Sequence, residues 1–148
     1  MSLLAIVLRW MHIVPAVVAG GATVFSALAL LPALGTRPDA ERLAVREAIM
    51  TRWRWVVMTC ITLLLGSGLA NFFLYQAPAH RGQPLYHGLF GLKFLMAMTV
   101  FFLASALTGR SAGLARIRAN ARFWTGLNAA LVVAIVLVSG ILRSIPPS

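Results

Sequence analysis

The chain has 148 residues, of which 60% are hydrophobic and only 11% are charged. This composition excludes a soluble globular domain, because the apolar residues form runs long enough to cross a lipid bilayer. The formal net charge is +10, but the basic residues lie in short connections between apolar runs, where they orient a membrane protein and contact anionic headgroups. We therefore expect no nucleic-acid partner and predict an integral membrane protein in the lipid bilayer.

Four apolar runs predict an all-α fold, an up-down four-helix bundle that spans the membrane. Each run has about the 20 residues that a transmembrane helix requires. No residues are left for a soluble domain, so residues 1–148 are predicted to form a single membrane domain. The predicted helices cover approximately residues 8–34, 53–76, 87–109 and 122–143.

The first run places a histidine close to its start. His12 is followed at helical spacing by the small residues Ala16, Ala19 and Gly20, and Arg9 lies one turn earlier on the same face. Small side chains allow either a neighbouring helix or a planar cofactor to lie flat against this stripe. The sequence alone favours the neighbouring helix.

The second run follows a charged segment, residues 39–53, which predicts an amphipathic lead-in to the membrane helix. Gly66 and Gly68 in this run allow a neighbouring backbone to come close. Asn71 and Tyr75 mark its far end.

Residues 76–87 contain two prolines and one glycine, which predicts a loop. This loop would bring His80, Arg81, Tyr86 and His87 to the edge of the third run. These side chains are among the few polar groups at this end of the predicted bundle.

Lys93 is the only lysine in the chain and lies inside the third run. At about 1.5 Å per residue it lies about 9 Å deeper than His87. An ammonium group at this depth is costly unless it is paired or hydrated, so we interpret Lys93 as a functional residue. Snorkelling to the nearer interface is the alternative. The membrane runs contain no Asp or Glu, so its partner would be Tyr86, a backbone carbonyl or an anionic ligand.

The distribution of basic residues predicts the orientation in the membrane. Nine arginines lie in the connections between the first and second runs and between the third and fourth, whereas the opposite face has only Arg9, Arg81 and Arg143. The positive-inside rule then places both termini on the outer, periplasmic side of a bacterial inner membrane. All three histidines would lie at this outer surface of a multi-pass protein.

His12 and His87 lie at matched depth on the first and third predicted helices, which can be diagonal neighbours in a bundle. Two such imidazoles can hold one metal ion between them, and imidazole suits haem iron, copper and zinc alike. Arg9, Arg81 and Arg143 favour haem, because its propionates need cationic partners near water. In the alternative interpretation, both histidines only contact headgroups and water, and no cofactor is bound.

Several short motifs resemble the membrane domain of the copper resistance D family. They are His12 near the start of the first run, the Gly20 and Gly21 pair, Leu-Leu-Pro-Ala-Leu at the end of that run, Gly-Ser-Gly-Leu-Ala in the second, and Tyr86 seven residues before Lys93. His12 and Lys93 are also similar to residues of the small four-helix bacterial protoporphyrinogen oxidases, which bind haem b. The resemblance implies that His12 ligates haem or a metal ion and that Lys93 is a second functional residue.

These observations predict a small haem b membrane protein with an electron-transfer or redox role near the outer surface. His12 would ligate the iron, and His87 or Lys93 would occupy or border the second axial position. A quinone or a porphyrin would be the redox partner if the protein is a membrane oxidoreductase. Two alternatives remain open: an accessory subunit of a larger membrane complex or a homo-oligomer, and a copper transport or resistance protein with Met11 beside His12.

Overall fold

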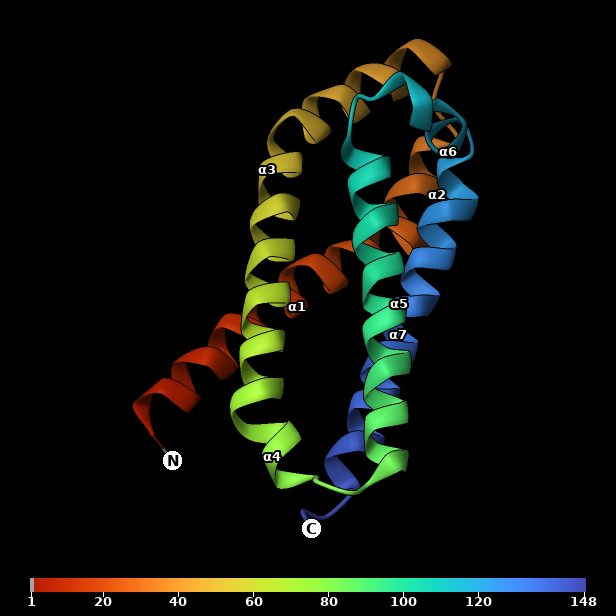
Figure 1. Cartoon of the computed structure of the whole chain (residues 1–148). Coiled ribbons are helices and arrows are strands. Elements are labelled where there is room, and N and C mark those ends of the chain that lie inside the picture. Colours follow the sequence, from red (N-terminus) through yellow and green to blue (C-terminus); the bar gives the residue numbers. More distant parts are fainter. Residues whose placement is uncertain (1) are drawn as a thin grey trace.

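The computed structural model describes residues 2–148 and is almost entirely helical, with no strand in that range. Four helices are long and apolar enough to cross a membrane (Figure 1). The prediction of an all-helical, multi-pass membrane protein is therefore confirmed. The first membrane helix comprises α1 (Leu3–Phe25), η1 (Ser26–Leu30) and α2 (Leu31–Leu34). The second comprises α3 (Asp39–Asn71), η2 (Phe72–Gln76) and α4 (Ala77–Ala79). The third is α5 (Pro84–Thr108) and the fourth is α7 (Ala121–Ser144), and the short helices η3 (Ala112–Leu114) and α6 (Ala115–Ala119) lie between them.

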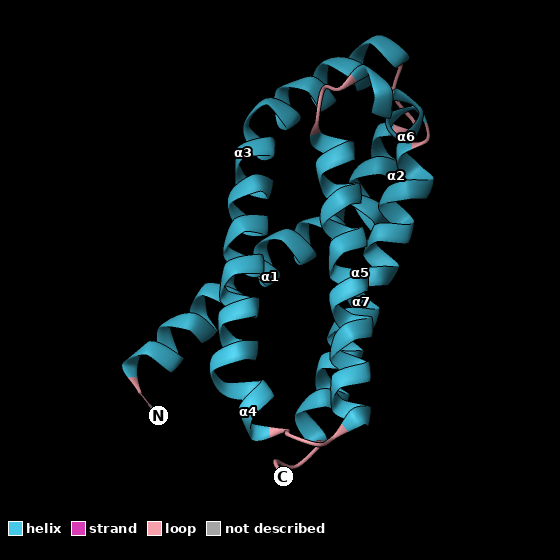
Figure 2. Cartoon of the chain, viewed as in Figure 1, coloured by secondary structure: helices cyan, strands magenta, loops and turns pink. Residues whose placement is uncertain are grey.

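The four helices pack as a ring in which α1 contacts α3 and α7, and α5 also contacts α3 and α7. The first and third membrane helices are therefore diagonal, as predicted. Figure 1 shows α3, α5 and α7 running alongside one another, whereas α1 crosses them obliquely and its N-terminal part projects away from the bundle. The loops are short and confined to the two ends of the bundle (Figure 2).

The second helix is much longer than predicted. It begins at Asp39, because the amphipathic lead-in continues into the membrane helix without a break, and it extends to Ala79. The predicted loop over residues 76–87 is therefore wrong except for the four residues after Ala79. Pro84 begins α5, where proline costs no backbone hydrogen bond. Pro78 lies in the last turn of the second helix, directly after the π turn η2.

The first two helices each contain a π-helical turn. The Leu31 N–H donates to the Ser26 carbonyl, and the Ala77 N–H donates to the Phe72 carbonyl, so each bond spans five residues instead of four. A π turn adds one residue without adding a full turn, and it rotates the residues after it relative to those before it. Asn71, directly before η2, and Gln76, the last residue of η2, line the same pocket.

Apolar side chains cover the outside of the bundle, as expected for a protein in lipid. Leu95 is 66% exposed and Leu137 is 65% exposed, although both lie in the middle of membrane helices. The interior is partly polar: Asn128 of α7 is only 2% exposed, and its Oδ1 has no hydrogen-bond partner within residues 2–148. The other buried side chains of α3, α5 and α7 are Val57, Cys60, Ser67, Tyr86, Leu103, Ala106, Thr108, Thr125 and Leu142.

Candidate functional site

A ladder of polar residues on the second helix, from α3 into η2, holds the N-terminal part of the first helix in place. Ser67, Asn71 and Tyr75 are spaced four residues apart, so they project from nearly the same side of the second helix. Each of them contacts a different level of α1. The three contacts join Ser67 Oγ to His12 Nδ1 (3.0 Å), Asn71 Nδ2 to the Leu8 carbonyl (3.3 Å) and Tyr75 OH to Ser2 Oγ (3.4 Å).

The contact with Ser67 fixes the protonation of the His12 ring. The Ser67 hydroxyl has one proton, and it donates this proton to the Leu63 carbonyl at 2.6 Å. Ser67 Oγ must therefore accept from His12 Nδ1–H. A neutral ring protonated on Nδ1 carries its lone pair on Nε2. This is the form in which imidazole binds a metal, with the other nitrogen held by a hydrogen bond.

Gly68 allows the His12 ring to lie directly against α3. A Cβ atom at residue 68 would lie 3.1 Å from His12 Cε1, which is closer than ordinary van der Waals contact. No other amino acid fits there unless the ring moves. Gly66, two residues earlier, faces open space, since a Cβ there would meet no atom within 4 Å.

This difference predicts opposite outcomes for two similar substitutions. Gly68→Ala is expected to lower the free energy of unfolding by roughly 1–3 kcal/mol, the usual cost of overpacking. Gly66→Ala, the matched control, should leave it unchanged or raise it slightly, because alanine favours the helix. Equilibrium unfolding of the detergent-purified variants measures both, and equal destabilisation by the two would contradict the packing of His12 on Gly68.

Lys93 comes from α5, on the opposite side of the ring of helices from α1. Its side chain is half-buried and lies within electrostatic range of the His12 ring. The two residues that carry the resemblance to the oxidases are therefore within electrostatic range of each other, although they come from diagonal helices.

The other two histidines form a separate group around the His80–Gln83 turn. The His80 ring is 4% exposed and stacks on the Tyr86 ring with 3.7 Å between centroids. Its Nδ1 lies 2.8 Å from Gln83 Oε1, while the Tyr86 hydroxyl donates to Gln76 Oε1 at 3.0 Å. His87 is exposed and lies 3.1 Å through Nε2 from the His80 carbonyl. A carbonyl oxygen only accepts, so His87 Nε2 is a donor and is not free to bind a metal.

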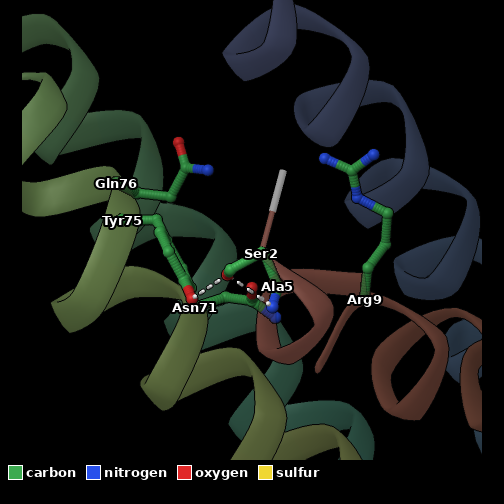
Figure 3. Close-up of a pocket in the computed structure, with 6 residues that line it drawn as sticks. All are labelled: Ser2, Ala5, Arg9, Asn71, Tyr75 and Gln76. Carbon is green, nitrogen blue, oxygen red and sulfur yellow. Dashed lines mark hydrogen bonds between the residues drawn. The ribbon is translucent and has the colours of Figure 1, made fainter. Parts of the chain in front are cut away.

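A polar pocket of about 240 Å³ adjoins the ladder. Figure 3 shows Ser2, Asn71 and Tyr75 gathered on one side of it and the Arg9 side chain on the other. Gln76 lines the pocket and also accepts the hydrogen bond of the Tyr86 hydroxyl, so the pocket lies next to the group around the His80–Gln83 turn. The lining residues are Ser2, Ala5, Arg9, Asn71, Tyr75 and Gln76.

The structure brings together only some of the predicted site residues. Arg9 lines the polar pocket beside the ladder, whereas Arg81 and Arg143 are exposed and do not line it. Gly20 faces α7, since a Cβ there would lie 3.1 Å from Val132 Cγ1. At Gly20, therefore, the stripe of small residues packs against a neighbouring helix, as the sequence alone favoured.

Ser67 and Gln76 were missed as site residues. The four-residue spacing of Ser67, Asn71 and Tyr75 was a signal for Ser67, because it places three polar side chains on one face of an apolar helix. Gln76 had no such signal, since it enters the same pocket only through the π turn.

Residues 2–148 contain no group of three or more His, Cys, Asp or Glu side chains that could hold a metal ion. No family model, no curated protein and no solved structure matches the chain. The fold and the site define a multi-pass, four-helix membrane protein in which His12, Lys93 and a polar pocket are the candidate functional features.

Proposed function

We propose that the chain is a haem b membrane protein in which Nε2 of His12 ligates the iron. The observation that carries this proposal is the state of the His12 ring: Ser67 engages Nδ1, and the lone pair remains on Nε2. The nearby Lys93 supplies a fixed positive charge. These two residues are also the ones that the resemblance to the protoporphyrinogen oxidases implies.

The residues around His12 have distinct roles in this proposal. Ser67 orients the imidazole, and Gly68 provides the room for its ring against α3. Arg9 is the one arginine of the predicted outer three that lines the pocket, so it is the candidate partner of a propionate. Bound haem would supply one-electron redox chemistry. His87 lies in the separate group around the His80–Gln83 turn, so Lys93 is the residue that would border the bound haem.

The polar pocket beside Arg9 offers a place for the redox partner. Asn71, Tyr75 and Gln76 present amide and hydroxyl groups there, which suit the carbonyl or hydroxyl groups of a quinone or the carboxylates of a porphyrin. The excess of arginine at the opposite end of the bundle supports an orientation in which this pocket and both termini face the periplasm. A bacterial inner membrane is the location that this orientation implies.

Absorption spectroscopy of the purified protein tests the proposal directly. Protein expressed in haem-replete cells should show a Soret band that shifts with dithionite, and a pyridine haemochrome assay should give a spectrum of haem b. Elemental analysis should find iron in proportion to protein. A colourless protein that is folded and monodisperse would contradict the proposal.

An accessory subunit or a homo-oligomer is the second candidate, and the exposure of α1 favours it. The N-terminal part of this helix projects from the bundle in Figure 1, and its large apolar side chains are uncovered: Leu3 is 78% exposed, Trp10 64% and Val17 68%. Another protein could cover this face as well as lipid does. Purification in mild detergent as a single species of monomer mass would contradict this candidate.

A further inference from the structure

A second pocket lies at the end of the bundle opposite the His12 site. It has a volume of about 350 Å³ and opens between the start of α3 and the end of α5. One part of its wall is apolar and another part is strongly basic. The lining residues are Leu43, Arg46, Glu47, Met50, Leu107, Thr108, Gly109, Arg110 and Arg118.

Three arginines are held in this pocket by neutral oxygen atoms. Arg46 Nη2 donates to the Leu107 carbonyl at 3.5 Å, and Arg110 Nη2 donates to Thr51 Oγ1 at 3.4 Å. Arg118 donates to two carbonyls, those of Ala106 and Ser111. Carbonyls at the C-terminus of a helix attract cations, so the end of α5 positions Arg46 and Arg118.

These bonds position the guanidinium groups but leave their charges uncompensated. Both ion pairs found in residues 2–148, Arg37 with Glu41 and Arg42 with Asp39, lie outside the pocket. Arg46 and Arg118 also lie near enough for their charges to repel each other. Three arginines against the single carboxylate of Glu47 leave the pocket with an excess of positive charge.

The chemistry of the walls specifies the ligand. Each guanidinium has five N–H donors, and few of them are used by the bonds described, so the three groups can bind phosphate oxygens through paired hydrogen bonds. Leu43, Met50 and Leu107 line the same pocket and present an apolar surface beside the charges. Phosphate next to hydrocarbon is the chemistry of a phospholipid headgroup and its acyl chains.

We propose that this pocket binds the phosphate of an anionic phospholipid from the adjacent leaflet, such as phosphatidylglycerol, through Arg46, Arg110 and Arg118. The lipid joins the charged start of α3 to the end of α5 and the connection after it. A soluble phosphate compound would use the arginines but not the apolar wall.

Native mass spectrometry of delipidated protein in a neutral detergent tests this site. Phosphatidylglycerol should bind at least about five-fold more tightly than phosphatidylcholine with the same acyl chains, because the attraction of a single arginine to anionic lipid already gives a preference of about this size. The double variant Arg46→Gln/Arg118→Gln should weaken phosphatidylglycerol binding roughly ten-fold or more. The matched control Arg116→Gln/Arg122→Gln removes the same charge from exposed residues outside the pocket and should change binding less than about two-fold at ordinary salt.

A single variant and a competition with inorganic phosphate complete the test. Arg110 is exposed and binds only the Thr51 side chain, so Arg110→Gln should weaken lipid binding several-fold with an unchanged unfolding transition, even if the double variant does not fold. Equal loss in the double variant and in its control would overturn the proposal in favour of a general surface attraction. Full displacement of the lipid by inorganic phosphate at about equal concentration would assign the site to a soluble phosphate compound and also overturn it.

Discussion

The His12→Ala variant is expected to retain less than about a tenth of the haem of the unchanged protein, because removal of a first ligand costs more than the 10- to 100-fold loss typical of an outer-shell change. The variant should still fold. Its direct structural loss is one interhelical hydrogen bond, which in membrane bundles is worth about 0.6 kcal/mol. The ratio of Soret to protein absorbance and the pyridine haemochrome yield measure the loss.

His87→Ala is the matched control for this variant. His87 is exposed, and its Nε2 bonds only to the carbonyl of the neighbouring turn, so its removal should leave the Soret band and its position unchanged. His80→Ala is a poor control, since His80 is buried and stacked on Tyr86. If His87→Ala loses the haem and His12→Ala keeps it, the assignment of the axial ligand is wrong.

The Lys93→Met variant is expected to keep its haem but with a lower midpoint potential. A fixed positive charge favours the reduced iron, which carries one positive charge fewer, so its removal favours the oxidised form. A unit charge at a separation of about 10 Å, in a medium of effective dielectric constant about 20, contributes about 1.7 kcal/mol, or on the order of 70 mV. A redox titration followed at the Soret band gives the shift.

Lys93→Arg is the control, because arginine retains the charge at the same residue. Its midpoint potential should stay within about 20 mV of the unchanged protein, since the Coulomb interaction is nearly the same. Identical potentials in Lys93→Met and in the unchanged protein would place the ammonium outside the electrostatic range of the iron. A merely structural role for Lys93 would destabilise the fold without this difference between Met and Arg.

The fold was predictable because hydropathy determines membrane helices almost by itself. Runs of about 20 apolar residues have few alternatives in a bilayer, where every backbone group must be bonded internally. The ends of the helices were harder to predict. Residues 39–53 are charged enough to lie outside the bilayer and yet continue the helix, and Pro78 is compatible with a helix at its particular residue.

The site was predictable in part. His12 and Lys93 stood out because polar groups inside a membrane run are costly, and the structure places them within electrostatic range of each other. Grouping His12 with His87 was an inference from depth alone. Depth does not determine which way a side chain points around its helix, and His87 faces the His80–Gln83 turn. The hydrogen bond from His12 to Ser67 depends on the crossing of α1 over α3, which no spacing within either helix reveals.

The π turn η2 has a consequence for how this protein can vary in evolution. Asn71 and Gln76 are five residues apart and line the same pocket. In a regular α-helix, side chains five residues apart point about 140° away from each other around the helix axis. A descendant that lost one residue between them would keep both amino acids and lose their shared surface. The pocket therefore depends on the number of residues in this turn as well as on their identity.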